Sequence, residues 1–203
     1  MKYLDYITGI INDAVAEALP CERMQVLGVA QSVRAVREDL VAKHGKKITW
    51  PAVYVGLGEL KYAGFDDAYD LCSYHRSLGM SVSRTSIGTY GDNDGYVKII
   101  HSMSLVIYAN REKINMASDK LALSMQFAFP YEFTKDQRPK DFYSIRTSIT
   151  NHVLNEEQVF NEEFKNVEYF LGPEHVLLKC NYQIESTLNK RCFNTECSSN
   201  DEA

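Results

Sequence analysis

The stretch GTYGDNDGYVKIIHSMSLVIYA, residues 88–109, runs from a turn-forming segment straight into a long apolar segment. Alternate positions of the apolar segment share one face of an extended chain: Val97, Ile99, His101, Met103, Leu105 and Ile107. The preceding segment MSVSRTSIGTY, residues 80–90, is also β-like. Asp-Gly is a favoured hairpin turn, because Gly accepts a positive φ angle and Asp tolerates one. The stretch therefore predicts a long β-hairpin between Met80 and Ala109, with its tip near Asn93.

The predicted hairpin has strands longer than the roughly five or six residues that are usual. We expect its outer part to project from the core, where it exposes backbone edges and apolar side chains that a partner can cover. The candidate contact with a neighbouring subunit is the tip of the hairpin: Tyr90, Gly91, Asp92, Asn93, Asp94 and Gly95.

The same tip raises the alternative of a calcium-binding loop. If Gly95 is the sixth position of such a loop, Tyr90 is the first ligand position and His101 is the twelfth. Tyr cannot supply the first carboxylate, and His cannot supply the terminal bidentate one. A site of the EF-hand type is therefore excluded, whereas a looser ion site at Asp92 and Asp94 stays open.

Upstream of the hairpin, the apolar spacing predicts a helix, a strand, a second helix and a second strand. The first helix ends at Pro20, and its apolar stripe has helical spacing: Leu4, Ile7, Ile10, Ile11, Val15, Ala18 and Leu19. A short strand is expected over residues 24–29 and a helix over residues 32–45, where Gly45 is the stop signal. The next strand lies in ITWPAVYVGLGEL, residues 48–60. Because Pro51 cannot donate a ladder hydrogen bond, we expect an edge strand or a strand start here.

Two glycines after that strand suggest a phosphate-binding loop, but the pattern is incomplete. Lys61 stands where a dinucleotide-binding fingerprint needs its third glycine. Gly56 and Gly58 are therefore interpreted as turn residues. The following segment, residues 61–77, is polar and aromatic without a clear period, and we expect an irregular connection.

Downstream of the hairpin, Asn110 is a favourable N-cap for a helix over residues 111–129, which Pro130 ends. Its predicted buried stripe is Ile114, Ala117, Leu121, Met125 and Phe129. Residues 133–147 contain Pro139 and show no period, which predicts a loop. A further helix is expected over residues 150–172, with its apolar positions at Val153, Leu154, Phe160, Phe164, Val167 and Phe170.

The last predicted strand is HVLLKCNYQIES, residues 175–186. Its inward face is expected to carry Leu178, Cys180, Tyr182 and Ile184. The polar segment 189–203 cannot bury enough surface to order itself and is expected to be a flexible tail. The order of elements predicts an α+β fold: a mostly antiparallel sheet with a long β-hairpin, packed by several helices on one side. Residues 1–188 are expected to form one domain.

Composition argues against several classes of function but does not identify one. The chain has 203 residues and a formal net charge of −5, so strong attraction to nucleic acid is not expected. We find no signal peptide and no apolar run of the roughly 18 to 20 residues that a membrane span needs, which predicts a protein made in the cytoplasm. The five cysteines contain no Cys-x-x-Cys pair, and the five histidines are scattered.

Catalytic motifs are not recognisable from spacing. The acids Glu156, Glu157, Glu162 and Glu163 could be paired carboxylates for acid–base chemistry, but a solvated helix face is the favoured interpretation. The alternative function is a small metal-dependent hydrolase or transferase that uses Asp92, Asp94, Glu59 and a nearby histidine. Activity that depends on added divalent ions and survives in a monomer would favour that alternative.

A family resemblance points instead to assembly. The order of WPAVYVGLGEL, the hairpin, SLVIYANREKI with its helix, and the late NVEYFLGPEHVLLKCNYQI resembles tail-terminator or neck ring proteins of tailed phages. The likeness is greatest to those of crAss-like phages that infect gut Bacteroidetes, and it covers residues 1 to about 188.

The resemblance implies a structural virion protein without cofactor, bound metal or catalytic residue. It implies a ring of six or twelve copies in the phage neck or tail, between portal and tail, that helps to join head and tail. The implied partners are the portal, other neck ring proteins and tail proteins. DNA would pass through the channel without specific binding, and no membrane is involved.

We predict that the hairpin tip binds no structural calcium, because Tyr90 and His101 cannot act as the end ligands of the loop. Calorimetric titration of the full chain with calcium should show no site tighter than about 10 μM, the weak end of sensor-type sites. A tighter site that is lost in an Asp92→Asn, Asp94→Asn variant would contradict this.

Overall fold

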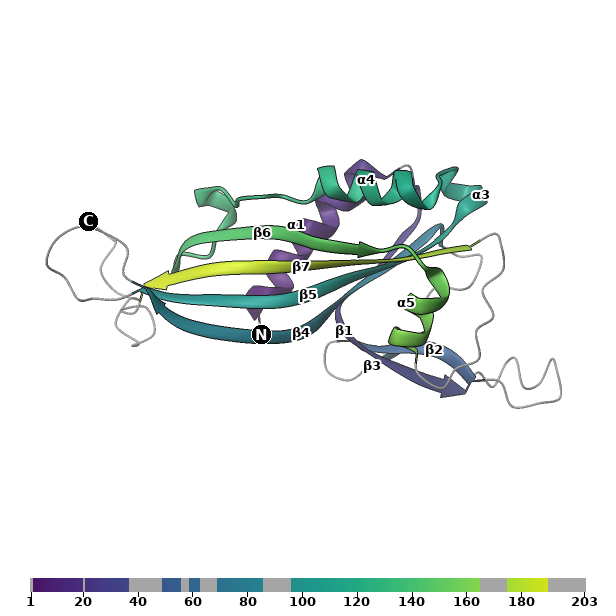
Figure 1. Ribbon diagram of the computed structural model, residues 1–203, viewed down its shortest axis with the longest axis horizontal. Coiled ribbons are helices and arrows are strands. Elements are labelled where there is room, and N and C mark those ends of the chain that lie inside the picture. Colours follow the sequence, from purple (N-terminus) through teal and green to yellow (C-terminus); the bar gives the residue numbers. More distant parts are fainter. Residues whose placement is uncertain are drawn as a thin grey trace, which may run out of the picture.

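The computed structural model describes residues 2–19, 21–36, 49–55, 59–62, 69–85, 96–164 and 175–189. In chain order its elements are α1 (Lys2–Ala18), β1 (Met24–Val36), β2 (Thr49–Val55), β3 (Glu59–Tyr62), β4 (Leu71–Thr85), β5 (Tyr96–Asn110), α3 (Arg111–Ile114), α4 (Ser118–Ala128), the 3-10 helix η1 (Lys135–Gln137), β6 (Phe142–Val153), α5 (Glu156–Glu163) and β7 (His175–Asn189) (Figure 1).

The described strands form one sheet in the order β3-β2-β1-β4-β5-β7-β6. Neighbouring strands are antiparallel except β1 and β4, which pair in parallel. The predicted α+β fold, with a mostly antiparallel sheet and helices packed on it, is confirmed. The long hairpin is confirmed as well, since β4 and β5 pair from Leu71 opposite Ala109 to Thr85 opposite Tyr96.

Strand β1 belongs to two parts of this sheet. Its first residues pair with β4, and its last residues, Ala30–Val36, pair with β2. The change occurs at an irregularity between Val26 and Val29, where Gly28 has a φ of 65°. A side chain there would meet no atom within 4 Å, so the requirement for glycine comes from the left-handed backbone alone. This bulge lets β1 turn away from the main sheet, and β2 and β3 lie below it in Figure 1.

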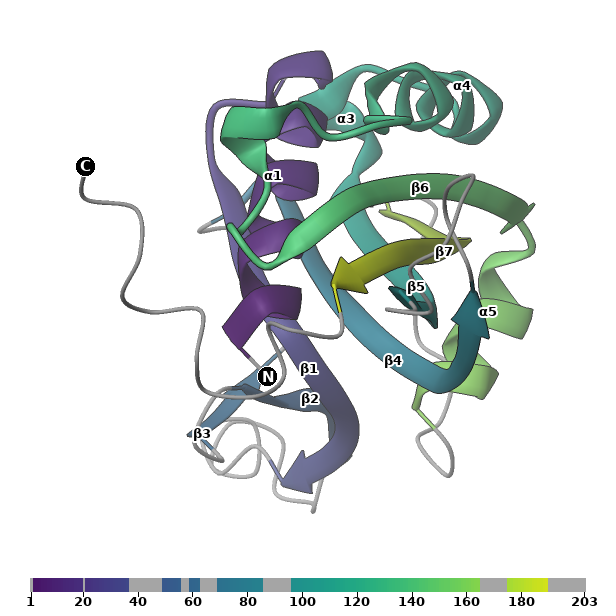
Figure 2. The ribbon, with the colours of Figure 1, turned by 90° about the vertical axis from the view of Figure 1, so that its left-hand side faces the viewer.

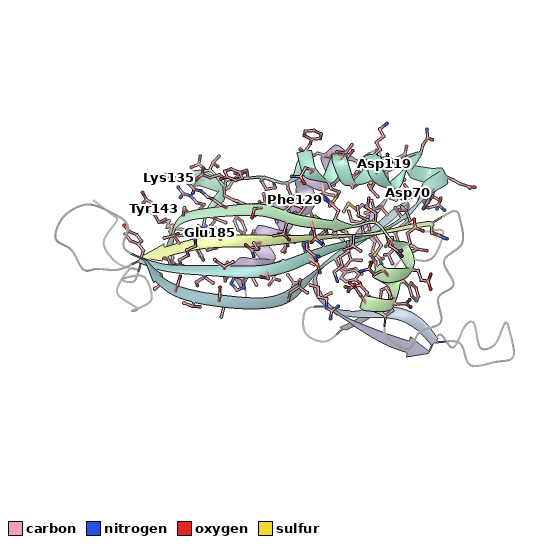
Figure 3. The ribbon with its side chains drawn as sticks, in the orientation of Figure 1. Asp70, Asp119, Phe129, Lys135, Tyr143 and Glu185 are labelled. Atoms are coloured by element: carbon pink, nitrogen blue, oxygen red, sulfur yellow. The ribbon has the colours of Figure 1, made fainter. Side chains whose placement is uncertain are left out.

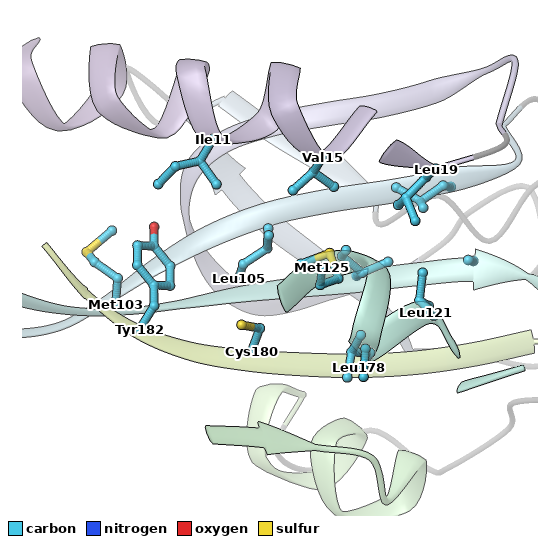
Figure 4. Close-up of a cluster of buried hydrophobic side chains, with 14 of the residues drawn as sticks. Ile11, Val15, Leu19, Met103, Leu105, Leu121, Met125, Leu178, Cys180 and Tyr182 are labelled. Carbon is cyan, nitrogen blue, oxygen red and sulfur yellow. The ribbon is translucent and has the colours of Figure 1, made fainter. Parts of the chain in front are cut away.

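Helices cover both faces of the main sheet. On one face, α1, α3 and α4 bury the larger apolar cluster (Figure 4), to which β5 contributes Met103, Leu105 and Ile107. On the other face, α5 buries a smaller cluster with Val159, Phe160 and Phe164. Figure 2 shows α4 and α5 on opposite sides of the sheet. The expectation that all helices lie on one side is therefore wrong.

The buried residues follow the predicted periods where the periods were clear. Along α1 the buried apolar positions are Leu4, Ile7, Ile11 and Val15, with Leu19 just beyond the helix. Two members of the predicted stripe are not buried, since Ile10 is half-buried and Ala18 is exposed. The inward face of β7 is Leu178, Cys180, Tyr182 and Ile184, as predicted. Asn110 caps α3, because its side chain accepts hydrogen bonds from the backbone N–H groups of Glu112 and Lys113.

Three predicted elements are wrong in the first part of the chain. Residues 32–36 belong to β1 and not to a helix, because their backbone pairs with β2; the remainder of that predicted helix lies outside the described residues. The predicted irregular connection over residues 61–77 contains the start of β4. The expected edge position is wrong, because β2 lies between β1 and β3. The alternative of a strand start fits, since Pro51 is near the beginning of β2 and lies just outside its pairing with β3, which begins at Ala52.

Three further predictions fail downstream. The helix predicted over residues 111–129 is two helices, because Asn115 adopts a left-handed conformation with a φ of 45° and ends α3. The loop predicted over residues 133–147 contains the first half of β6, and the helix predicted over 150–172 is α5 alone within the described residues. The turn at Gly56 and Gly58 and the tail beyond Asn189 lie outside the described residues.

A polar network lies inside the larger cluster, between α1 and the sheet. His75 of β4 is fully buried; its Nε2 lies 3.1 Å from Asn12 Oδ1 and its Nδ1 lies 2.7 Å from Tyr182 Oη. An amide oxygen only accepts, so Nε2–H donates to Asn12 and Tyr182 donates to Nδ1. A neutral imidazole therefore satisfies both partners, and the network sets the position of α1 on the sheet.

We predict that His75 makes the fold less stable in acid. Burial lowers the pKa of His75 from 6.5 to about 3, so between these values the unfolded chain binds a proton that the native chain does not. The contribution of His75 to the free energy of unfolding is complete above pH 6.5 and falls by up to about 1.4 kcal/mol per pH unit below it.

Urea unfolding between pH 7 and pH 5 measures this slope. A His75→Gln variant should show a shallower slope than the parent, whatever its absolute stability. An unchanged slope would mean that His75 does not contribute to the acid sensitivity.

Candidate interaction surface

The six predicted site residues, Tyr90 to Gly95, lie outside the described residues. The described part of the candidate surface is the outer hairpin, which we define as Arg76–Thr85 of β4 with the residues Tyr96–Ser104 that pair with it. Its position in the sheet decides what it can contact.

One edge of the outer hairpin is open among the described strands. Strand β1 pairs with β4 only as far as Val29 opposite His75, and no described strand pairs with that side of β4 beyond it. Such an edge presents unpaired backbone N–H and C=O groups, which can pair with a strand of another chain. The open edge is ten residues long, Arg76–Thr85, and begins where β1 turns away.

Apolar side chains line this edge. Leu78, Met80 and Val82 have exposed fractions of 49%, 56% and 57%. Met80 lies opposite His101 and Val82 lies opposite Ile99 in the register of the hairpin, so both share the face on which α1 packs. Ile99 and His101 are buried there. The apolar surface therefore continues from the core to the open edge.

The outer hairpin does not project alone. Strand β7 pairs with β5 out to Asn189 opposite Tyr96, and β6 reaches Phe142 opposite Leu188. Figure 1 shows β4, β5, β6 and β7 reaching the same end of the molecule. The expectation of a projecting outer part is wrong for the described residues, because β7 pairs with β5 over its full length and β6 in turn pairs with the outer part of β7.

His101 does not face an ion site. It is buried, and its Nε2 is in hydrogen-bond contact with the hydroxyl of Tyr3 from α1. Burial lowers the pKa of His101 and raises that of Tyr3 to about 12, so both groups are neutral near pH 7. The twelfth position of the hypothetical calcium loop therefore belongs to the core.

The four acids of α5 are not one solvated face. Glu163 is buried, and its carboxylate lies 2.9 Å from Lys179 Nζ, 3.1 Å from Arg76 Nη1 and 3.2 Å from the hydroxyl of Tyr74. Glu162 lies 3.0 Å from the same Lys179 Nζ. The interpretation as a solvated helix face is therefore wrong for Glu163.

The remaining acids of α5 behave differently. Glu156 pairs with Arg111 at the start of α3, whereas Glu157 is exposed. Of the four acids of α5, only Glu163 is buried, between the helix and the sheet.

The cluster around Glu163 contains two carboxylates, Glu162 and Glu163, and two cations, Arg76 and Lys179. Burial opposes the charged form of Lys179, but the hydrogen bond and the charge of Glu163, followed by those of Glu162, outweigh it and raise the pKa of Lys179. Hydrogen bonds from Gln158 and Lys179 lower the pKa of Glu162. Lys179 and Glu162 are thus charged near neutral pH. Through these contacts the cluster joins α5 to β4 and β7. Proton transfer to a substrate is not favoured, since Glu163 has three donors around it and is closed off from solvent.

The sequence carried a weak signal for this cluster. Lys179 stands between Leu178 and Cys180 in a strand that is apolar on both sides, and a lysine there needs a buried partner. Its partner could not be chosen from the sequence, because Glu162 and Glu163 were two of several acids.

The described residues contain no group of three or more His, Cys, Asp or Glu side chains that could hold a metal ion. Asp92 and Asp94, the carboxylates of the alternative hydrolase function, lie outside the described residues, as does the side chain of Glu59.

Among the described helices none is both long and apolar enough to cross a membrane. Neither the family models nor the curated proteins with which the chain was compared match it.

We predict that Glu163→Gln lowers the free energy of unfolding by about 3 kcal/mol, because it leaves the buried ammonium of Lys179 without its closest counter-ion. Glu157→Gln is the matched control on the exposed side of the same helix, and it should change stability by no more than about 0.5 kcal/mol. Urea unfolding of both variants tests this, and equal stabilities would show that the cluster does not stabilise the fold.

Proposed function

We propose that this chain is a structural ring protein of the phage neck or tail, similar to tail terminators, and that the outer hairpin joins neighbouring copies. The observation that carries the proposal is the open edge of β4 at Arg76–Thr85, lined by Leu78, Met80 and Val82. An exposed apolar edge of this length favours unwanted pairing in a monomer, and a neighbouring copy in a ring covers it.

A closed ring requires heterologous contacts, in which each copy presents one surface to one neighbour and a different surface to the other. The edge of β4 meets this requirement because the opposite end of the sheet is β6, a strand of different composition. The outer part of β4 exposes three apolar side chains among serines, whereas β6 exposes Arg146, Ser148 and Thr150 and one large apolar side chain, Tyr143. The two edges are not equivalent, which favours a directional contact over a symmetric pair.

The buried polar groups also favour an assembly role over catalysis. His75 lies beneath α1 and Glu163 beneath α5, and each is held by partners within the fold. A substrate would have to displace a helix to reach either group. In the proposed role the protein is made in the host cytoplasm, enters the virion between portal and tail, and contacts the portal, neck and tail proteins. DNA passes through the ring without specific binding.

We predict that the chain forms a high-order oligomer, and that Val82→Lys weakens it without unfolding the subunit. A lysine on an edge strand opposes pairing with another strand, because its charge would be buried in the new contact. Light scattering after size-exclusion chromatography, at several protein concentrations, gives the mass. Leu123→Lys is the matched control, since Leu123 is an equally exposed apolar residue on α4, away from the edge, with an exposed fraction of 58%.

Removal of residues 91–95, with a two-residue turn in their place, tests the tip itself. The shortened protein should fold and assemble less well. If it enters particles and supports tail attachment as the parent does, the tip is not the assembly element. If the parent chain stays a monomer alone and with portal particles, the ring proposal is wrong.

A further inference from the structure

A polar hollow of about 520 Å³ lies at the end of the sheet that is farthest from α5. Strands β5, β6 and β7 form its floor, and the segment between α4 and β6 forms one wall. Figure 3 labels Tyr143 and Glu185, both from its lining, at this end of the molecule. The floor is continuous, because Lys98 and Ser144 both lie opposite Thr187 in the register of the strands.

The hollow contains three cationic side chains and two carboxylates. Lys98 Nζ lies 2.7 Å from Glu185 Oε2, and Arg146 Nε lies 3.4 Å from Glu132 Oε1. Arg138 is the third cation. Among the described residues it forms no ion pair, and its Nε is buried without a hydrogen-bond acceptor. Leaving such a donor unpaired costs free energy, and more when the group is charged. The hollow thus lacks one acceptor, at Arg138.

We propose that this hollow binds a single carboxylate of an acidic protein segment, and that Arg138 is its anchor. A guanidinium pairs with a carboxylate through two parallel hydrogen bonds, one of which Nε can supply. One carboxylate also neutralises the surplus charge, since the hollow carries three positive and two negative groups.

A phosphate group fits the hollow less well. It carries a charge of about −1.5 to −2 near pH 7 and would be repelled by nearby carboxylates. Glu132 and Glu185 are both in the lining. A nucleic acid backbone brings a row of singly charged phosphates, of which the hollow has surplus positive charge to neutralise only one. A single carboxylate is therefore the better partner for this set of groups.

The local backbone holds Arg138 in place. It directly follows η1, where Gln137 accepts hydrogen bonds from both the backbone N–H and the hydroxyl of Thr134. The backbone N–H of Arg138 donates to the carbonyl of Lys135, and Pro139 follows it. A side chain that starts from a fixed backbone loses less freedom on binding, which favours recognition.

Among the acidic segments of the chain, we consider two as sources of this carboxylate. One is the hairpin tip with Asp92 and Asp94, which a neighbouring copy would supply in the ring proposed above. The other is the acidic end of the sequence, with Asp201 and Glu202. The chemistry of the hollow is the same for both, and the experiment separates them.

Fluorescence anisotropy with labelled peptides tests the site in the full-length chain. The probes are the tip peptide GTYGDNDGY, its variant GTYGNNNGY without carboxylates, the tail peptide NTECSSNDE, and inorganic phosphate as a competitor. We expect an acidic peptide to bind at least about tenfold more tightly than GTYGNNNGY, equivalent to about 1.4 kcal/mol. Arg138→Gln should abolish this preference, while Lys140→Gln, an exposed neighbour outside the hollow, should preserve it.

The outcomes either support the carboxylate site or overturn it. Arg138-dependent binding of the tip peptide or of the tail peptide supports the site and names its source. Equal binding of the acidic and neutral peptides overturns it, as does binding that survives in Arg138→Gln or competition by phosphate at lower concentration than by peptide. The comparison of the acidic and neutral peptides needs no variant protein. This comparison can also be made if the chain is a monomer. Failure of the ring proposal and failure of the carboxylate site are therefore distinguishable.

Discussion

The structure depends on the pairing of β5 on both of its sides over its whole length. Strand β4 lies along one side and β7 along the other, and fourteen or more residues of β5 are in register with each. From Met103 to Ala109 every residue of β5 is buried, because helices pack on both faces of the sheet. Once β5 is placed, the two neighbouring strands, the two apolar clusters and the helices that cover them follow from the alternation of its side chains.

The double burial of the sheet explains where its polar groups lie. On the α1 face, a neutral His75 satisfies Asn12 and Tyr182, so no charge is needed. On the α5 face, Glu162 and Glu163 together balance Lys179 and Arg76 instead. Both solutions satisfy groups that would otherwise be costly to bury. They differ in charge: the network around His75 is neutral, whereas the cluster around Glu163 consists of ion pairs.

The outer end of the sheet contrasts with this closed interior. There β4 has an open edge among the described strands, and the hollow on β5, β6 and β7 contains Arg138 without a carboxylate. The two features have separate origins. The edge of β4 is open because β1 turns away at the Gly28 bulge, and the hollow is not covered by α5 because that helix packs on the other end of the sheet. The apolar edge and the polar hollow lie at the same end of the molecule but on opposite faces of the sheet, because Met80 and Val82 lie opposite odd-numbered residues of β5 whereas the floor of the hollow includes Lys98.

Local sequence patterns were enough to predict the elements whose periods are clear: α1, the β4–β5 hairpin, the cap at Asn110 and the inward face of β7. Local pattern suffices there, because one face of each element is apolar. It did not determine the start of β4, the strand β6 or the extension of β1, since His75, Arg146 and Gln31 break an apolar pattern in segments that only pairing makes extended. The contact of Glu163 with Lys179 depends on the tertiary structure, as does the lack of an acceptor for Arg138 Nε among the described residues. Charge pairing between distant segments depends on which faces meet, and no local period records that.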